Sequence, residues 1–254
     1  MMNSRICWSL FAAVIALSGC DGGTSTVPRS SISLSFSSRD PAASAFSAVQ
    51  SALPPDTMRS GSNVLIVDKV EIVLKQIELK SVSVADCDLV PQPAGCTDFK
   101  TDPLVLDLPL GIGAQQLIAV DIPPGTYSKV EFEIHKLSSG DTRSAALRAA
   151  RPDLVDRSIR VVGKFNGTAF IFESDLDVEQ ELTLAPPMVI NSTTSTNLTI
   201  RFTIANWFRT QAGALVSPMT ANKGGANESL VKENIKSSMK AFKDDDRDGD
   251  DRDG

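Results

Sequence analysis

The sequence has 254 residues, 42% of them hydrophobic, and a formal net charge of −6. This hydrophobic content excludes an intrinsically disordered chain and suffices for the core of one ordinary to large domain. Seven Asp and two Arg in residues 244–254 hold most of the charge, which leaves 22 basic and 24 acidic side chains in residues 20–243. A nearly neutral body without a basic stripe argues against nucleic acid as a partner.

Residues 1–19 have the pattern of a bacterial lipoprotein signal peptide. Arg5 supplies the positive charge, and Trp8–Leu17 is an apolar run too short to span a bilayer. The sequence Leu-Ser-Gly-Cys ending at Cys20 resembles a lipobox, which predicts cleavage before Cys20 and a lipid on its thiol. An ordinary secretory signal followed by a chance cysteine is the alternative. We expect residues 20–29 to form a polar tether between this lipid anchor and the folded domain.

Alternating apolar and polar residues predict a series of β-strands after the tether. The expected strands are Ser30–Ser38, Val64–Val84, three strands within Asp102–Leu137, a hairpin over Ser158–Ser174, Asp177–Ala185 and Asn197–Asn206. The apolar phase changes near Lys75, which indicates a β-bulge. Proline and glycine in Pro123-Pro124-Gly125-Thr126 predict a turn, and Asn166-Gly167 is the strongest short signal for a hairpin turn.

Three segments are expected to be helical. Ala42–Leu53 and part of Arg143–Arg157 favour short helices. The third is an amphipathic helix that begins after Asn227 as the N-cap and continues through Phe242. Its apolar side chains fall near one face, so we expect the helix to dock on the body of the protein.

The predicted fold class is mainly β, an antiparallel β-sandwich of prealbumin or immunoglobulin type with a C-terminal amphipathic helix. The sandwich is expected to span residues 30–209. Residues 210–243 would form a loop and the docked helix. Residues 244–254 would be an acidic, disordered tail.

Three segments together resemble a family of uncharacterised bacterial lipoproteins. They are Val67–Leu79, Val105–Leu137 with its PPGTY turn, and Asn197–Phe208 running into GGANESLVKENIKSSMKAF. The family carries a domain of unknown function, and the resemblance implies a transthyretin-like or prealbumin-like β-sandwich over most of Val64–Phe242. It implies no activity for any residue.

Two cysteines flank a loop that contains proline and glycine, Cys87 and Cys96. In an oxidising compartment two cysteines at this spacing are expected to form a disulfide, which would stabilise the fold by roughly 2–3 kcal/mol on the chain-entropy model. A metal site is the alternative, but the spacing is not CxxC and no histidine is near in sequence.

Other candidates for chemistry are few. His135 is the single histidine and shares a strand face with Glu131 and Glu133, so a solvated or interface role is favoured over catalysis. No GxSxG motif accompanies it. Glu173, Asp175 and Asp177 resemble an acid cluster, although a solvated strand edge is the more ordinary interpretation.

The acidic tail contains the one constellation with specific chemistry. Asp244, Asp246 and Asp248 alternate and are followed by glycine, which matches the first half of a calcium loop, DxDxDG. Asp250 is the expected fourth ligand. The bidentate acid of position twelve would fall one residue beyond Gly254, so any binding of Ca²⁺ is expected to be weak. A plain acidic tail is the favoured interpretation, and no other cofactor is expected.

These features predict a membrane-anchored, extracytoplasmic lipoprotein of the bacterial cell envelope, facing the periplasm or the exterior. Its expected role is non-catalytic binding or scaffolding. The expected partners are the lipid bilayer and an envelope protein or a carbohydrate. One alternative is a calcium-responsive adhesion module acting through the Asp-rich tail, and another is an enzyme with an unrecognised site.

Overall fold

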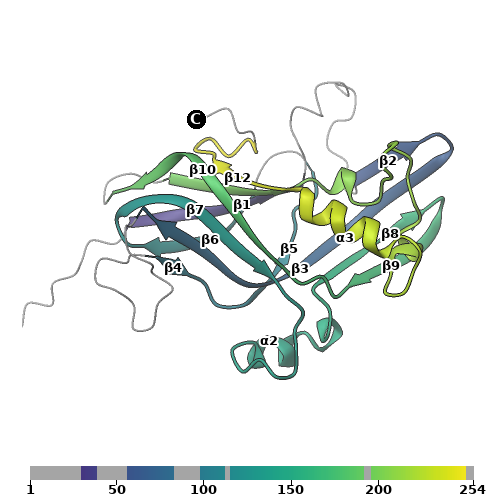
Figure 1. Cartoon of the computed structure of the whole chain (residues 1–254), viewed down its shortest axis with the longest axis horizontal. Helices are drawn as coiled ribbons and strands as arrows, with labels where there is room; N and C mark the ends of the chain where they lie inside the picture. The colour runs from purple at the N-terminus through teal and green to yellow at the C-terminus, as the bar shows by residue number, and fades with distance from the viewer. Residues whose placement is uncertain (1–29, 39–55, 83–97, 112–114, 192–195, 250–254) are drawn as a thin grey trace, which may run out of the picture.

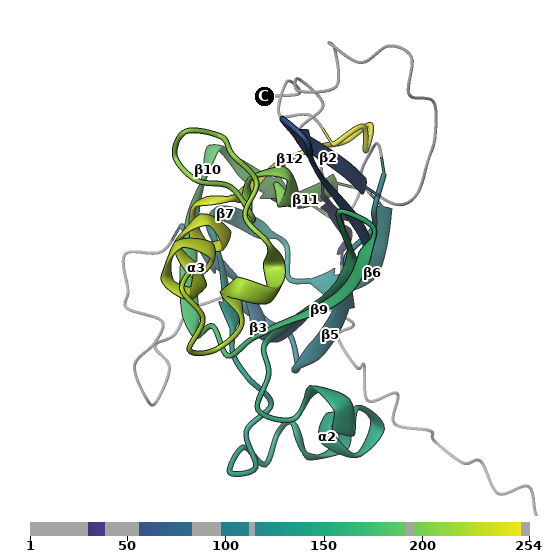
Figure 2. The same cartoon turned by 90° about the vertical axis from the view of Figure 1, so that its right-hand side faces the viewer.

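The computed structural model describes residues 30–38, 56–82, 98–111, 115–191 and 196–249. The described residues are mainly β and form two sheets (Figures 1 and 2). Among them, no helix is long and apolar enough to cross a membrane. Cys20, Cys87, Cys96, Asp250 and the expected helix Ala42–Leu53 lie outside the described residues.

The larger sheet has eight strands and the order β10-β7-β3-β8-β9, with β2, β4 and β5 also paired to β3. Its strands are β2 (Asp56–Ser60), β3 (Asn63–Ser81), β4 (Phe99–Lys100), β5 (Leu104–Asp107), β7 (Gly125–Ile134), β8 (Ile159–Phe165), β9 (Thr168–Ser174) and β10 (Val178–Ile190).

The smaller sheet has four strands in the order β12-β11-β1-β6. They are β1 (Ser30–Ser37), β6 (Gln115–Ile122), β11 (Thr196–Phe202) and β12 (Met239–Lys243). The helices are α2 (Ala145–Ala150) and α3 (Glu228–Ser237), with 3₁₀ turns η1 (Pro152–Leu154), η2 (Ile204–Asn206) and η3 (Pro218–Ala221).

The long strand β3 organises the larger sheet. Its first half pairs with β8 and its second half with β7. The register with β7 shifts between Leu74 and Gln76, which confirms the bulge predicted near Lys75. The β8–β9 hairpin is also confirmed, because Asn166 and Gly167 turn it with φ of 51° and 83°. Both positive values suit the twist of a two-residue hairpin turn.

The apolar faces of both sheets contribute to one hydrophobic core. The alternate residues Ile32, Leu34 and Phe36 of β1 are buried in the same cluster as Val130, Phe132 and Ile134 of β7. The rings of Phe132 in β7 and Phe202 in β11 lie 5.8 Å apart. The predicted inward face of β7 is therefore confirmed.

The antiparallel prediction is wrong for one pair of strands. β1 and β11 are parallel, with Ile32 opposite Thr196 and Phe36 opposite Ile200. Alternation reveals which residues share a face, but it carries no information about which distant strand pairs with which, or in what direction. The smaller sheet is consequently mixed, while every strand pair in the larger sheet is antiparallel.

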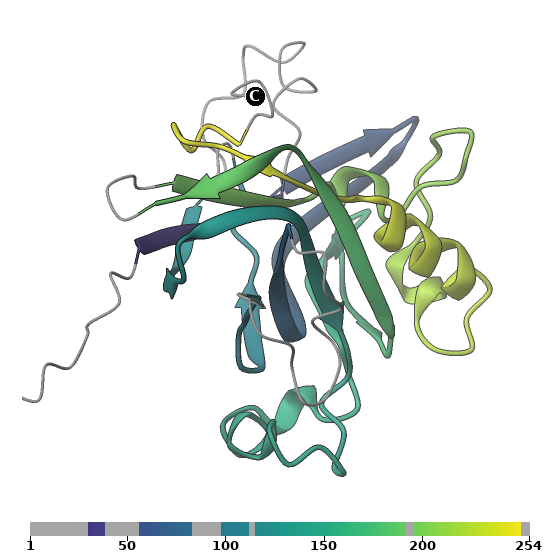
Figure 3. The ribbon, with the colours of Figure 1, turned by 60° about the vertical axis from the view of Figure 1, so that its left-hand side comes forward.

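The predicted helix from Asn227 to Phe242 is correct only in its first part. α3 begins after Asn227 and ends at Ser237, and Val231 and Ile235 are its buried residues. The next residues form β12, which pairs with β11 and lies beside β10 (Figure 3). The apolar positions 239 and 242 suit a helix face as well as a strand, so the non-local pairing with β11 decides the outcome.

Candidate metal centre

The face of the smaller sheet that points away from the core is polar and nevertheless buried. Ser33 and Ser35 of β1, and Asn197, Thr199 and Arg201 of β11, are each at most 4% exposed. Both serine hydroxyls lie 2.7 Å from Oδ1 of Asn197 and donate hydrogen bonds to it. One amide oxygen thus joins the two parallel strands.

The residues after β12, Asp244–Gly249, lie over this polar face and are called the C-terminal loop. The amide of Asp244 donates to the carbonyl of Asn197 at 3.0 Å, and Nδ2 of Asn197 donates back to the carbonyl of Asp244 at 2.8 Å. Nη2 of Arg247 donates to the hydroxyl of Ser33 at 3.0 Å. The prediction of a disordered tail is therefore wrong for residues 244–249, because the polar face offers partners that the loop uses.

The loop gathers the carboxylates that the DxDxDG pattern singles out. One oxygen from each of Asp244, Asp246 and Asp248 lies within 4.8 Å of the others. Gly249 takes a φ of 80°, which suits the glycine that follows three alternating acids in a calcium loop. Its amide donates to Oδ2 of Asp244 at 3.2 Å, and its carbonyl accepts from Nη1 of Arg201 at 3.0 Å.

Asp244 is the unusual member of this cluster because it is fully buried. Its Oδ2 accepts a 2.6 Å hydrogen bond from the hydroxyl of Thr199, whereas its Oδ1 has no hydrogen-bond partner among the described residues. Burial raises the pKa of the Asp244 carboxyl above its ordinary value, and Asp246 and Asp248 add to the rise. A buried oxygen without a partner, close to two more acids, is a costly arrangement unless a cation is bound there.

The donor set at this cluster consists of carboxylate oxygens, with no nitrogen or sulfur ligand among them. Hard cations prefer oxygen, and Ca²⁺ accepts six to eight oxygen ligands in flexible geometry. The three aspartates fit such an ion, and backbone carbonyls and water would complete its coordination. The sequence identified these three residues. It contained no sign of the part played by Asn197 and Thr199, which hold Asp244, because polar residues alternating along a strand resemble a solvated face.

A cavity of about 180 Å³ lies next to this loop, between β10 and β12. It is lined by Thr183, Leu184, Ala185, Pro186, Met188, Ala241, Phe242 and Lys243. Pockets for small-molecule ligands usually enclose about 300–1,000 Å³. This cavity is below that range, so we assign no small-molecule ligand to it.

The other acidic candidates take separate partners. His135 Nδ1 lies 3.0 Å from Oδ2 of Asp177, and these two residues and Glu133 form a second group with ligand atoms within 4.8 Å. Glu133 already pairs with Lys75 at 2.7 Å, and Asp177 is 64% exposed. Neither the ion pair of Glu133 nor the exposure of Asp177 points to a bound ion, so we assign no metal site to this group.

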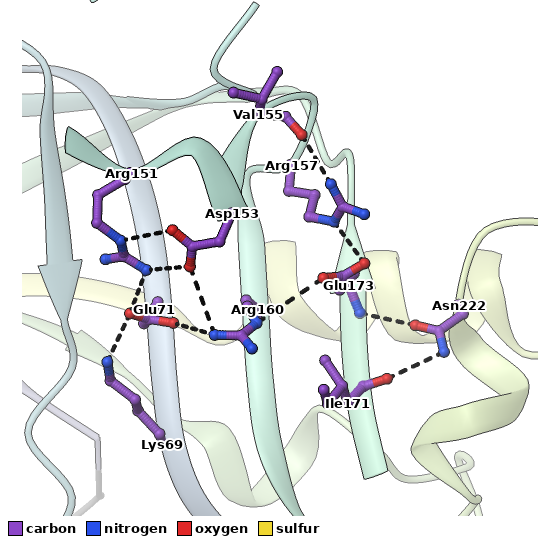
Figure 4. A network of polar contacts seen from close by, with 10 residues as sticks. All are labelled: Lys69, Glu71, Arg151, Asp153, Val155, Arg157, Arg160, Ile171, Glu173 and Asn222. Carbon is purple, nitrogen blue, oxygen red and sulfur yellow. Dashed lines mark hydrogen bonds and ion pairs between the residues drawn. The ribbon is translucent and has the colours of Figure 1, made fainter. Parts of the chain in front are cut away.

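Glu173 and Asp175 do not join Asp177 in a single cluster. Glu173 forms an ion pair with Arg157, while Asp175 binds Lys223 and Lys232. Glu173 is also bound through its amide by Asn222, whose side chain bridges to the carbonyl of Ile171 along the outer edge of β9 (Figure 4). These residues connect neighbouring segments of the fold.

A larger ion-pair network surrounds Glu71 of β3, whose side chain is 1% exposed (Figure 4). Oε1 accepts from Lys69 at 2.7 Å and from Arg151 at 2.8 Å, and Oε2 accepts from Arg160 at 3.2 Å. Burial would raise the pKa of Glu71, but the hydrogen bonds from Lys69 and Arg151 outweigh it and hold the pKa below its ordinary value. Both oxygens of Glu71 are occupied, which indicates a structural role in fastening Arg151 to the sheet.

Comparison with protein-family models, with curated proteins and with solved structures found no match to this chain. The resemblance to bacterial lipoproteins therefore stays a prediction from the sequence, and the case for a function depends on the geometry of the C-terminal loop.

Proposed function

We propose that this protein is a calcium-binding lipoprotein of the bacterial cell envelope with a non-catalytic binding or scaffolding role. The observation that carries the calcium assignment is the fully buried carboxylate of Asp244, whose Oδ1 lacks a hydrogen-bond partner within the described residues. Asp246 and Asp248 supply further carboxylate oxygens close to the carboxylate of Asp244. A divalent cation would satisfy the unpaired oxygen and relieve the repulsion among the three acids.

The expected location supports the choice of ion. The lipobox ending at Cys20 predicts an extracytoplasmic domain, and calcium loops of extracellular modules bind with dissociation constants of about 10⁻⁴–10⁻³ M. Asp246 and Asp248 are exposed, so water can complete the coordination. We expect affinity in this weak range and modest selectivity over Mg²⁺.

The proposed architecture for this role is a β-sandwich of prealbumin or immunoglobulin type. Its support is the single core shared by both sheets and the contact between Phe132 and Phe202, one from each sheet. The metal centre would then lie on the outer face of the smaller sheet, away from the sandwich core.

Calcium titration of the full chain, purified in detergent, tests the metal centre. Calorimetry is expected to show one weak site in the wild type. The affinity of Asp244→Asn for calcium should be at least about tenfold lower, since that variant removes a charged ligand. Asp245→Asn is the matched control, because Asp245 lies in the same loop but outside the cluster. Equal isotherms for the wild type and Asp244→Asn would overturn the assignment.

The anchor has its own test. Cells expressing the wild type and Cys20→Ser are fed a fatty-acid probe, and labelling of the protein is compared. Label on the wild type alone is the expected result. Equal labelling of both proteins would contradict the proposed lipid attachment at Cys20.

A further inference from the structure

The C-terminal loop is attached to the smaller sheet by polar contacts alone. Residues 244–249 read Asp-Asp-Asp-Arg-Asp-Gly and offer no apolar side chain to the sheet. The contacts that hold them include the bonds to Asn197 and Thr199, the bond from Arg247 to Ser33, and the bond from Arg201. In an open loop these groups would form hydrogen bonds with water instead, so the contacts contribute little net free energy to closing the loop. A change in solution conditions can therefore open it.

Charge within the closed loop opposes closure. Closing brings three carboxylates within 4.8 Å of one another and places Asp244 out of contact with water. Opening would separate the charges and hydrate Oδ1 of Asp244. A bound cation reverses this balance, because it needs the three carboxylates together and finds them together only when the loop is closed.

The outer face of β1 and β11, beneath the loop, is polar but shielded from water. Six polar side chains on the outer face of β1 and β11 are almost fully buried, although the outer face of a sheet in a two-sheet protein normally contacts water. They are Ser33, Ser35, Ser37, Asn197, Thr199 and Arg201. β1 begins immediately after the expected tether, and Arg247 reaches across to its Ser33. The closed loop therefore joins the first strand after the tether to β11 and β12.

We infer that calcium controls this cover: with the ion bound, the C-terminal loop is closed over β1 and β11, and without it the loop opens and exposes their polar face. This inference rests on the proposed calcium site. It adds a consequence for the surface of the protein, since falling calcium would present hydroxyl, amide and guanidinium groups that are otherwise hidden.

Thiol labelling measures directly whether the C-terminal loop is closed over the sheet. In Ser35→Cys a thiol replaces a fully buried hydroxyl that donates to Asn197, the residue whose amide holds the carbonyl of Asp244. A maleimide reagent is added to the full chain in saturating Ca²⁺ or in EDTA, with labelling of the wild-type cysteines subtracted. We expect labelling of Ser35→Cys to be at least about tenfold faster in EDTA, because reactivity follows access to the thiol.

Two further positions serve as controls. Ser158→Cys is buried at a site remote from the loop in sequence and contacts, and it should label slowly in both conditions. Thr168→Cys is exposed at the start of β9 and should label fast in both. If Ser35→Cys binds calcium by calorimetry but labels at one rate with and without the ion, the cover is refuted while the calcium site stands. If neither the wild type nor Ser35→Cys binds calcium, both proposals fail.

A second measurement needs no substitution beneath the loop. In the closed loop the guanidinium of Arg247 donates to the hydroxyl of Ser33, so trypsin should cleave after Arg247 faster when the loop leaves the sheet, and intact-mass analysis detects the product. Cleavage of the wild type at this bond should be faster in EDTA than in Ca²⁺, whereas the rate for Asp244→Asn should be the same with and without Ca²⁺. Equal cleavage of the wild type in both conditions would overturn the inference even if Ser35→Cys does not fold.

Discussion

The hydroxyl of Thr199 lies 2.6 Å from Oδ2 of Asp244, and both side chains are fully buried on the face of the sheet opposite the core. Thr199 belongs to β11, and Asp244 follows β12, which pairs with β11. One oxygen of Asp244 is thus held by the sheet, while its Oδ1 has no hydrogen-bond partner among the described residues, and the carboxylate belongs to the cluster with Asp246 and Asp248. The sheet thereby positions one carboxylate of the candidate metal centre.

Replacing Thr199 by valine removes the donor with little change in shape. Because a hydrogen bond to a charged group contributes about 1.5–3 kcal/mol, Thr199→Val should lower the free energy of unfolding by about that amount, measured by urea denaturation in saturating Ca²⁺, where the loop is closed. Thr57→Val is the control, since Thr57 is an exposed strand residue and its replacement should change the value by less than about 0.5 kcal/mol. Equal effects of the two substitutions would mean that the bond to Asp244 is unimportant.

The two faces of β7 predict opposite responses to truncation. Phe132 is fully buried and contacts the ring of Phe202, so Phe132→Ala should cost roughly 3–5 kcal/mol of unfolding free energy from lost burial and a cavity. His135 is partly exposed and pairs with the exposed Asp177, so His135→Ala should cost far less. Denaturant titrations that gave the reverse order would show that the facing of β7 is wrong.

Local patterns in the sequence identified most of the strands and the turns. The alternation in Ser30–Ser37, the phase change near Lys75 and the Asn166-Gly167 turn all depend on neighbouring residues, and the structure has each of them. Periodicity and turn chemistry act over a few residues, so they can be recognised without knowledge of the fold.

The parts that could not be predicted depend on distant residues. Met239–Lys243 becomes a strand because β11, some forty residues earlier, offers its edge. The serines of β1 look solvated in sequence but are buried because of polar contacts with Asn197 and Arg247. The DxDxDG pattern located three candidate ligands, yet only the fold shows that Asp244 is buried and fixed by Thr199. The candidate metal centre therefore depends on a local motif and on tertiary contacts that the motif does not reveal.

Gly163 of β8 lies where a side chain cannot be accommodated. A Cβ at this position would collide with the backbone carbonyl of Ile66 in β3, and a backbone group cannot move aside without disturbing the sheet. Gly163→Ala should therefore lower the free energy of unfolding by about 1–3 kcal/mol. Gly140→Ala is the control, because open space surrounds that position and the change should be within about 0.5 kcal/mol. A neutral Gly163→Ala in chemical denaturation would contradict the close approach of β3 and β8.

The last prediction concerns the ion pairs that hold α3. Asp175 lies 2.8 Å from Nζ of Lys232 on α3 and 2.9 Å from Nζ of Lys223. Hydrogen bonds from Lys232 and then Lys223 hold the pKa of Asp175 well below its ordinary value of 3.8. A carboxyl with a lowered folded-state pKa binds fewer protons in the folded than in the unfolded protein. Its stabilising contribution is therefore present above the ordinary value and is lost as the pH falls through the folded-state pKa.

Asp175→Asn should consequently lower the free energy of unfolding at pH 7, by roughly 1 kcal/mol, since Lys223 is exposed and its share is screened by solvent. The difference from the wild type should shrink as the pH is lowered below 3.8, because the carboxyl of the unfolded wild type then binds a proton, and it should vanish only once the folded-state carboxyl is protonated too. Denaturation in EDTA at a series of pH values measures this, with exposed Asp102→Asn as the charge-matched control. A difference that stays constant across the acidic range would show that packing of residue 175, and not its charge, fastens α3 to the sheet.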